Sequence, residues 1–453
     1  MISIPSSCKG KGKFRRGIHP AGHKDLAQQM RIEALPLPKE VAIALSQHIG
    51  APCKPTVKSR DEVLVADMVG DVDSFIGAPV HASVNGKVGR QRLATLPSGQ
   101  HISVLPIKTG SEQIPEAEVF DEVYGGKWST AAIDELDPRA IVEKIRDAGI
   151  VGHGGAAFPT FVKLMRNKDK PVDTLLVNGC ECEPFLTADH RLMLEAPAPI
   201  VVGALIAAHA AGAENVVIAL EDNKRDAAEA LRKEAEGSGV KIAVVKTHYP
   251  MGGEKQTVKA VLDRKIPTGG LPLDIGVVVV NVATVAAIAR AVLRGKPVTH
   301  RIVTVTGAGI HTPKNVLAPI GASYQDLIDF CGGLKPIAAR VVSGGPMMGF
   351  AIGDLSAPIT KGTSGIVVLT EEDVKRSAET TCVRCGRCVD VCPLNLVPSK
   401  MAMASRHADF ELARKYQIEA CMECGCCAYT CPASIPLVQL VRVGKGGVKS
   451  LED

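Results

Sequence analysis

The stretch TCVRCGRCVDVCP, residues 381–393, carries four cysteines in the spacing C-x2-C-x2-C-x3-C, and a proline follows the last one. A second stretch, CMECGCCAYTCP at 421–432, repeats both the spacing and the proline. Three thiolates separated by two residues each can curl around one cube-shaped iron–sulfur cluster, whereas the fourth cysteine of such a run ligates the other cluster of a pair. The two stretches therefore predict two [4Fe–4S] clusters that exchange their fourth ligands.

This crossed pattern assigns the ligands. We expect one cluster on Cys382, Cys385, Cys388 and Cys431, and the other on Cys421, Cys424, Cys427 and Cys392. Structural zinc, the competing metal, takes four ligands from two short arms, but each stretch here holds four cysteines by itself. Cys426 adds a thiol inside the second spacing and is predicted to be a bystander. The connection 393–420 is rich in Ala, Met, Leu and Arg, which predicts one or two helices in an enlarged ferredoxin-type module.

Composition narrows the class of protein. A chain of 453 residues suggests roughly two to four domains, and a hydrophobic content of 46% is enough for a sizeable core. Aromatic residues make up 3%, which argues against a stacking platform for nucleic acid. The 14 cysteines are clustered and no apolar signal segment is visible, so we expect metal ligation in a reducing cytosol, with Cys180 and Cys182 as small packed residues.

Two features concern membranes and partners. The longest uncharged run, 196–213, contains two prolines and falls short of the roughly 20 apolar residues that cross a bilayer, so we expect a buried helix and no transmembrane segment. The net charge is +5, and basic stretches lie at 9–16 (KGKGKFRR) and 441–449 (VRVGKGGVK). These stretches suit an acidic partner or an anionic membrane surface, or they are solvated termini.

The stretch GIVGHGGAAFPTFVKL at 149–164 suggests a ligand loop. Its glycines let the backbone approach a ligand, and the following helix start offers free N–H groups to an anion, although a plain tight turn is the alternative reading. Downstream, strands alternate with helices: a strand from 173, a helix at 199–212, a strand at 215–220, a helix at 223–237, a strand at 241–247 and a strand running into a helix at 276–292. This alternation predicts a parallel sheet with ligand loops at the carboxyl ends of its strands.

These motifs carry a resemblance. The string G-x-G-G-A-x-F-P-T-x-x-K, followed by N-x-x-E-x-E-P, Y…G-E and N-x-x-T, resembles the flavin-binding subunit of respiratory complex I. With FRRGIHP, LPLPKEVAIALSQHIGAPCKP and the two cysteine stretches, the chain resembles the RnfC family of Rnf complex subunits over nearly its whole length. Those complexes are membrane-bound ferredoxin:NAD+ oxidoreductases coupled to ion transport.

The resemblance implies specific binding residues and no catalytic acid or base. It implies that non-covalent FMN is bound by Gly152, Gly154, Gly155, Lys163, Asn178, Glu181, Tyr249, Gly253, Asn281 and Thr284. It implies that NAD(H) is contacted by Phe158, Glu183 and Glu254. The chain departs from the complex I pattern at His153, Cys180, Lys255 and Ala283, and at the longer loop before Glu254.

The remaining segments are expected to be scaffolds. Residues 36–112 resemble the barrel-sandwich hybrid of lipoyl and biotinyl carriers, and Asn85-Gly86 predicts a hairpin that joins HASV to KVGR. Because Asn85-Gly86 occupies the tip where a carrier lysine would stand, we predict an unmodified domain. Residues 299–345 resemble a β-grasp (SLBB) module.

The predicted fold is thus a multidomain α/β protein with a Rossmann-like flavin domain. The predicted parts are an N-terminal extension (1–35), the barrel-sandwich hybrid (36–112), a linker (113–135), the FMN/NAD(H) domain (136–298), the SLBB module with its return strands (299–372), a helical two-cluster domain (373–445) and a tail (446–453).

The predicted function is electron transfer between NAD(H) and a pair of clusters. FMN is needed because a hydride carries two electrons and a cluster accepts one. The resemblance implies a peripheral subunit on the cytoplasmic side of the cell membrane, whose partners are membrane-embedded chains and a ferredoxin-reactive iron–sulfur subunit. Two alternatives are a flavin and iron–sulfur corrinoid reductase of a bacterial microcompartment, and a non-catalytic wiring subunit with a vestigial flavin site.

Overall fold

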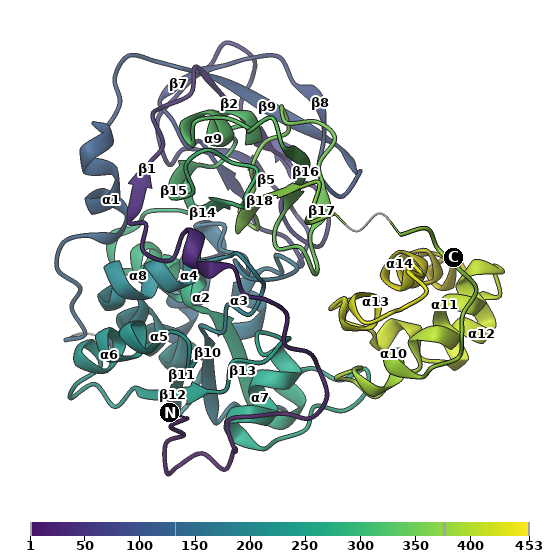
Figure 1. Ribbon diagram of the computed structural model, residues 1–453. Helices are drawn as coiled ribbons and strands as arrows, with labels where there is room; N and C mark the ends of the chain where they lie inside the picture. The colour runs from purple at the N-terminus through teal and green to yellow at the C-terminus, as the bar shows by residue number, and fades with distance from the viewer. Residues whose placement is uncertain (1, 132, 375–376, 452–453) are drawn as a thin grey trace.

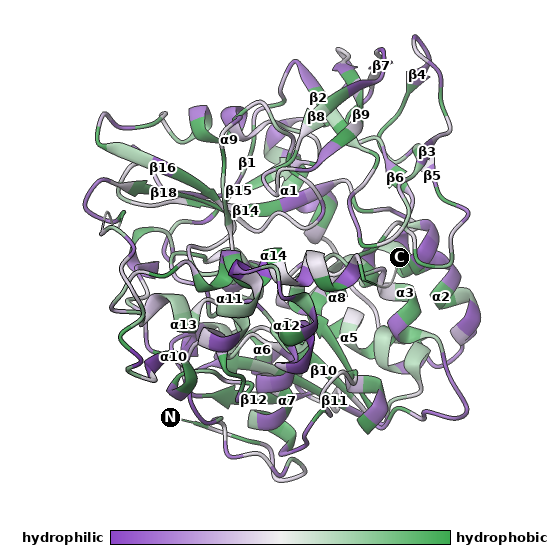
Figure 2. Ribbon diagram, turned by 90° about the vertical axis from the view of Figure 1, so that its right-hand side faces the viewer, coloured by the Kyte–Doolittle hydropathy of each residue, from purple (hydrophilic) through white to green (hydrophobic). Residues whose placement is uncertain are grey.

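The computed structural model describes residues 2–131, 133–374 and 377–451. At its centre lies a parallel sheet ordered β12-β11-β10-β13 (Figure 1). Its strands are β10 (Thr174–Asn178), β11 (Asn215–Glu221), β12 (Lys241–Val245) and β13 (Val277–Asn281). Leu175 and Val177 enter one hydrophobic core and Leu176 enters another, so both faces of the sheet are buried. Strands buried on both faces need continuous apolar sequence, which Figure 2 shows along β10 and β12.

Helices cover both faces of this sheet. The larger core lies under α2 (Pro138–Asp147), α3 (Thr160–Leu164), α4 (Ala188–Glu195), α5 (Pro197–Ala211), α6 (Arg225–Glu234) and α8 (Val282–Arg294), whereas α7 (Glu254–Leu262) packs on the opposite face, before the short 3-10 helix Pro272–Ile275. The chain lays down β10, β11 and β12 in one direction and then returns to place β13 beside β10. Ligands in open α/β sheets bind at such a reversal, outside the carboxyl ends of the strands.

The crossing of α5 and α8 depends on Gly203. A Cβ added to Gly203 would lie 1.8 Å from the carbonyl oxygen of Val285, so the helices can only approach this closely with glycine there. We expect Gly203→Ala to lower the free energy of unfolding by about 1–3 kcal/mol, because the helices must separate. Gly353→Ala is the control, since its Cβ would enter open space and its φ is not positive. Urea unfolding checks both variants, and equal stabilities would contradict the packing argument.

The N-terminal barrel-sandwich region consists of two small antiparallel sheets. One is ordered β2-β9-β7-β4 with β8 paired to β9, and the other is β3-β5-β6. The strands are β2 (Glu40–Ala44), β3 (Lys54–Pro55), β4 (Glu62–Val63), β5 (Met68–Asp71), β6 (Val80–His81), β7 (Gly86–Val88), β8 (Arg92–Thr95) and β9 (His101–Thr109), and α1 (Glu116–Tyr124) follows them. Their inward residues form one shared apolar core.

The hairpin predicted at Asn85-Gly86 is wrong. Strand β6 pairs with β5, whereas β7 pairs with β4 and β9, so the two flanking segments belong to different sheets. The Asn85 side chain accepts from Val65 N–H at 2.7 Å and donates to Glu112 O at 2.6 Å, which fixes a crossing point rather than a turn. At Gly86 a Cβ would lie 2.1 Å from Lys108 O, so glycine serves close strand approach here.

A mixed sheet ordered β1-β15-β14-β18-β16-β17 forms the third layer. It contains β14 (His300–Thr306), β15 (Lys314–Pro319), β16 (Ala338–Ser343), β17 (Phe350–Ala351) and β18 (Gly365–Thr370), with α9 (Tyr324–Phe330) packed on it. The predicted strand–turn–strand–helix order of the β-grasp segment is present. No sequence pattern indicated β1 (Ile32–Ala34), which joins the edge parallel to β15.

The N-terminal segment ties these layers together. Ser3 bridges to Val244 of β12, and Ile18 bridges to Tyr249. Gly17 N–H then donates to Val391 O at 2.9 Å, which reaches the C-terminal cysteine region. Figure 1 shows this purple segment crossing the parallel-sheet layer before it rises, past the 3-10 helix Lys24–Leu26, to β1.

The cysteine region is a small helical body beside the other layers (Figure 1). It consists of α10 (Arg387–Asp390), α11 (Pro398–Arg406), α12 (Phe410–Lys415), the 3-10 helix Ile418–Ala420, α13 (Cys426–Tyr429) and α14 (Leu437–Lys449). The predicted one or two helices of the connection are therefore α11 and α12. Within the described residues, no single helix is long and apolar enough to cross a membrane, and α4 with α5 meet that test only as a pair bent by 96°.

Lys361 joins three layers from a fully buried position. Its ammonium donates to Pro79 O at 2.6 Å and to Gly149 O at 2.7 Å, and Lys361 N–H donates to Gln47 Oε1 at 2.9 Å. Burial away from water lowers the pKa of Lys361 from 10.5 to about 7. The ammonium thus holds the start of the glycine loop, which begins at Gly149.

This burial predicts a pH dependence of stability. Between about pH 7 and 10 the unfolded chain binds more protons at Lys361 than the folded chain, so the free energy of unfolding rises with pH by roughly 1.4 kcal/mol per unit. Lys361→Met is expected to lack this rise, and urea unfolding at several pH values measures it. Parallel pH profiles for the two proteins would contradict the assignment.

Candidate functional site

The carboxyl ends of β10 and β13 bring two predicted flavin ligands together. Asn178 and Asn281 are register partners at the last position of their strands. The Asn281 amide donates to Asp189 Oδ2 at 2.7 Å, and its oxygen accepts from Ala283 N–H at 2.8 Å, which caps helix α8. The Asn178 amide donates to Gly252 O at 2.8 Å. Both side chains are therefore held at the reversal of strand order.

The glycine loop folds over the first turn of α8. Gly152 N–H donates to Phe158 O at 2.9 Å and closes the loop into a small hairpin. His153 N–H donates to Thr284 Oγ1 at 3.0 Å, which fastens the hairpin to the helix. The loop thereby places the predicted residues Gly152, Thr284 and Phe158 in one local structure.

Glycine is required at one position of this loop and leaves room at the next. A Cβ on Gly154 would lie 2.8 Å from the Asn281 amide nitrogen, whereas a Cβ on Gly155 would enter open space. The ring of His153, which stands where complex I has arginine, is buried with both nitrogens unpartnered. Burial and the Arg301 guanidinium hold the His153 pKa well below its usual value, so the ring is neutral.

Charged groups meet at the rim of the same site. Lys163 extends from α3, and its ammonium lies 2.7 Å from Glu254 Oε1 and 3.3 Å from Val279 O. Glu254 begins α7 directly after Gly253, so this rim also carries the free N–H groups of a helix start. The side chain of Gln256 is buried, and its Oε1 has no partner within the described chain. Gln256 was not predicted, because a lone glutamine after a Gly-Gly-Glu turn carries no sequence signal.

The residues at this reversal fit FMN. An ammonium and a helix start suit a phosphate, and the two asparagines and the unpartnered Gln256 oxygen suit hydroxyl and ring polar atoms. The open space beside Gly155 lies on the loop that is anchored to α8. Six predicted flavin residues beyond the glycine loop's tip thus face one region: Gly152, Lys163, Asn178, Gly253, Asn281 and Thr284.

Glu181 has a different place from the one implied for a flavin ligand. Its carboxylate is buried and accepts from Asp189 N–H at 3.0 Å and from His190 N–H at 3.3 Å, at the start of α4. Desolvation raises the pKa of Glu181, and Lys24 and Lys224 oppose this rise. Glu181 therefore shapes the loop after β10 from below the site.

Tyr249 and Glu183 lie at the junction with the cysteine region. The Tyr249 hydroxyl donates to Cys424 O at 2.7 Å and contacts Glu183 Oε1 at 3.3 Å. Glu183 Oε2 accepts from Met347 N–H at 3.1 Å, and burial raises the pKa of Glu183 to about 7. Glu183 is thus enclosed by three segments, while Phe158 and Glu254, the other two residues implied for NAD(H), stay at the rim.

One buried cavity gathers the second cysteine set. Cys392, Cys421, Cys424 and Cys427 line it together with apolar residues that include Leu396, Met401 and Val441. Cys392 comes from the first stretch, so the crossed ligation predicted from the proline-flanked cysteines has its residues in place. Soft thiolates in an apolar wall are the donor set that an iron–sulfur cluster requires. Cys426 also borders this cavity, and its thiol hydrogen bond lowers the pKa of Cys424.

The first cysteine set lies nearer the surface. Cys431 is buried in an apolar cluster that also contains the partly buried Cys388, whereas Cys385 is exposed. In the described part of the chain, no three His, Cys, Asp or Glu side chains are grouped tightly enough for a single metal ion. The fit to a four-iron cluster therefore rests on which cysteines border the same space.

The flavin loop and the second cysteine set are in direct contact. A Cβ on Gly253 would lie 2.6 Å from the Met422 methyl carbon, and Tyr249 bonds to Cys424. Cys182, Tyr249, Met422, Cys424 and Cys426 share one small apolar cluster. Of the two cysteine sets, the second therefore lies against the reversal of the sheet.

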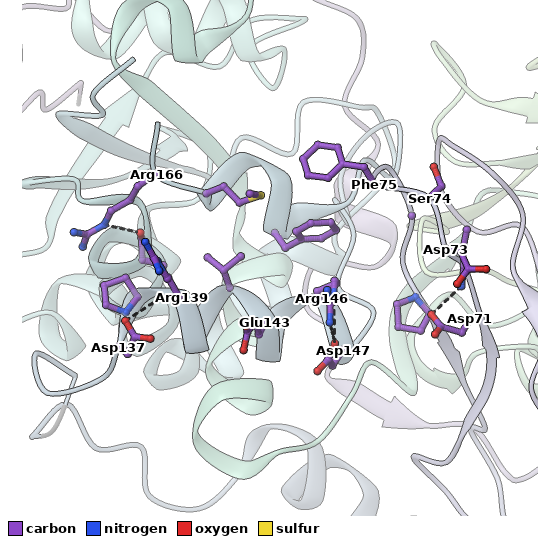
Figure 3. A pocket seen from close by; sticks show the side chains of 18 of the residues that line it. Asp71, Asp73, Ser74, Phe75, Asp137, Arg139, Glu143, Arg146, Asp147 and Arg166 are labelled. Atoms are coloured by element: carbon purple, nitrogen blue, oxygen red, sulfur yellow. Dashed lines mark hydrogen bonds and ion pairs between the residues drawn. The ribbon is translucent and has the colours of Figure 1, made fainter. Parts of the chain in front are cut away.

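The largest cavity lies elsewhere, between the barrel-sandwich region and helices α2 and α3 (Figure 3). It measures about 1000 Å³, and Figure 3 shows Asp137 and Arg139 at one end and Asp71 and Asp73 at the other. Arg146 is engaged by Asp147 at 3.0 Å. Phe161 lines this cavity from the helix that carries Lys163, so α3 separates the cavity from the candidate flavin site.

A parallel sheet with a flavin-type glycine loop, joined to a paired-cluster module, defines a flavin and iron–sulfur oxidoreductase component. Four family models agree with this class: the Nuo51 FMN-binding domain at residues 145–290, the RnfC barrel sandwich hybrid domain at 12–112, an SLBB domain at 302–351 and a 4Fe-4S dicluster domain at 374–432.

The chain belongs to the RnfC family. It is 41% identical over 89% of its length, and 86% of the relative's, to the RnfC-type component of the proton-translocating ferredoxin:NAD(+) oxidoreductase complex of Clostridium ljungdahlii. It is 41% identical to the counterpart in the Na(+)-translocating complex of Acetobacterium woodii, over 87% of this chain and 88% of the relative. It is also 41% identical to the counterpart in the ion-translocating oxidoreductase complex of Rhodobacter capsulatus, over 96% of this chain and 82% of the relative.

Proposed function

We propose that this chain exchanges a hydride between NAD(H) and FMN at the reversal of the parallel sheet and relays single electrons through two [4Fe–4S] clusters. The observation that carries the proposal is the contact between the glycine-bordered site and the second cysteine set, through Gly253, Met422, Tyr249 and Cys424. A site for a two-electron carrier that touches a site for a one-electron carrier is the arrangement that this conversion requires.

Each group at the site has a defined task in this proposal. FMN, when bound, supplies the conversion between an electron pair and single electrons. Lys163 and the start of α7 hold its phosphate, and Asn178 and Asn281 fix its orientation. The glycine loop, anchored to α8 through Thr284, presents backbone rather than side chain to the ring. Hydride transfer depends on such positioning and needs no proton donor from the chain.

The rim residues are proposed to receive the nicotinamide nucleotide. Phe158 offers a ring for stacking beside the glycine loop. Glu254 is half exposed and accepts from Lys163, so its carboxylate is available to nucleotide hydroxyl groups when Lys163 turns to a phosphate. Glu183 instead stays buried at the junction, where it orients Tyr249 toward the second cysteine set.

The family indicates the complex and its location. We propose that the chain is a peripheral subunit of an ion-translocating ferredoxin:NAD+ oxidoreductase at the cytoplasmic face of the cell membrane. Its partners in this proposal are membrane-embedded subunits and an iron–sulfur subunit that reacts with ferredoxin. The N-terminal region matched by the barrel-sandwich model favours this arrangement over a corrinoid reductase.

Cofactor content tests the proposal. The chain, expressed and purified without oxygen, is expected to release about one FMN and about eight irons per chain, four for each cluster. The preparation is expected to reduce a viologen dye with NADH as the electron donor. Iron without flavin, and no dye reduction, would instead identify a wiring subunit.

A further inference from the structure

The two cysteine stretches are structural repeats with different surroundings. Arg384 and Glu423 stand at equivalent positions and have φ values of 55° and 59°, and Gly386 and Gly425 follow with 77° and 80°. Each loop then enters a short helix, α10 or α13. The same loop shape therefore occurs twice in one small body.

The second loop is docked onto protein. Cys424, Gly425 and Cys426 are buried, and a Cβ on Gly425 would lie 2.7 Å from Met347 O. Met422 packs against Gly253. The charge at Glu423 is satisfied inside the chain by Arg442 and Lys445, at 2.8 and 2.7 Å. This loop shows how the repeat binds a redox site: an apolar side chain at its second position makes the contact, and backbone approaches backbone.

The first loop presents the same features to solvent. Residues 383–387 are all exposed, and the apolar side chain of Val383, equivalent to Met422, is 66% exposed. Cys385, a predicted cluster ligand, is exposed as well. Arg384 and Arg387 form no ion pair with any described residue.

The charge around the first loop is positive. Arg16 donates from its guanidinium to Val389 O at 2.8 Å, so the basic N-terminal stretch ends beside helix α10 and adds a third cation to Arg384 and Arg387. Asp390 is the acidic residue of this helix. Guanidinium groups pair with carboxylates in bidentate geometry, so this face suits an acidic partner.

We propose that the loop Cys382–Cys388 is the docking surface for an acidic protein that carries its own redox centre. The proposal rests on the proposed function, which supplies the cluster beneath the loop. In each encounter one electron crosses: the partner's centre loses it and the cluster held by this loop gains it, and no proton moves and no bond breaks. Two encounters deliver the electron pair of one hydride. A lipid surface is the weaker occupant, because it brings no redox centre to the exposed Cys385.

Charge reversal on the loop tests the proposal. The variant is Arg384→Glu with Arg387→Glu in the holoprotein, and Glu at 384 is compatible with the backbone because Glu423 adopts the equivalent φ. The matched control reverses Arg232 and Lys233, an exposed basic pair on α6 of the parallel-sheet layer. Iron content and circular dichroism confirm that each variant is folded and loaded.

The probe is a purified acidic two-cluster ferredoxin, and its binding is measured by calorimetry at low and high salt. We expect the loop variant to bind at least about tenfold more weakly at low salt and to lose most of the salt dependence, while the control stays within about twofold of the native chain. Equal binding by the loop variant and the native chain overturns the proposal. So does a loop variant that keeps ferredoxin binding but loses binding to phosphatidylserine vesicles.

Reduction by NADH, followed in the same preparations, separates the two proposals. Native chain and both variants are expected to reduce dye from NADH equally, because the loop lies outside the flavin site. If the native chain shows no reduction by NADH but binds ferredoxin through the loop, the docking proposal stands and the proposed function fails.

Discussion

A Cys424→Ala variant is expected to retain about half the iron of the native chain and to transfer no electrons from the flavin to the remaining cluster. Cys424 borders the buried cavity with Cys392, Cys421 and Cys427, so its removal leaves that cluster one thiolate short. This cluster is also the one beside the flavin loop, so the path to the other cluster is interrupted. Iron analysis and anaerobic absorbance spectra after NADH addition measure both effects.

The chain offers a matched control for this variant. Cys426 lies two residues away, is equally buried and hydrogen-bonds to Cys424, but is predicted to be a bystander. Cys426→Ala is therefore expected to keep the full iron content and the electron transfer. If Cys426→Ala loses half the iron and Cys424→Ala loses none, the ligand assignment is wrong and Cys426 is the fourth thiolate.

Lys163→Ala is expected to weaken FMN binding by about tenfold or more. A hydrogen bond to a charged group contributes about 1.5–3 kcal/mol, and every 1.4 kcal/mol is a factor of ten in the dissociation constant. The Lys163 side chain is 29% exposed, so the lower end of that range applies. Fluorescence titration of the flavin-free chain with FMN measures the constant.

Lys170→Ala is the control for this second variant. Lys170 forms an ion pair with Asp274 at 2.6 Å, away from the reversal of the sheet, and its side chain is 51% exposed. We expect its FMN affinity to match that of the native chain. An unchanged affinity in Lys163→Ala, or an equal loss in both variants, would show that Lys163 does not hold the phosphate.

The sequence predicted those parts of the fold in which pattern and spacing carry physical information. The alternation of apolar strands with helices specified the parallel sheet, since β10 to β13 are buried on both faces and must be continuously apolar. The repeated cysteine spacing specified a paired-cluster module, and the cavity that Cys392 shares with the second stretch agrees with crossed ligation.

Contacts between distant segments were not predictable. The Asn85-Gly86 pair has the chemistry of a hairpin turn, but its flanking segments enter different sheets, which only tertiary pairing decides. Strand β1 has three residues and no alternation, so its pairing with β15 carried no signal. Glu183 stands in a motif that implies nucleotide contact, yet burial by the segment at Met347 turns its carboxylate toward Tyr249.

The proposed electron path can be tested in a single preparation, by anaerobic titration of the native, fully loaded chain with NADH, followed at the flavin and cluster absorbance bands. We expect NADH to bleach the flavin band and the cluster bands to bleach with it, because the flavin site and the second cysteine set are in contact. A chain that carries full flavin and iron but whose clusters stay oxidised while NADH reduces the flavin would contradict this path.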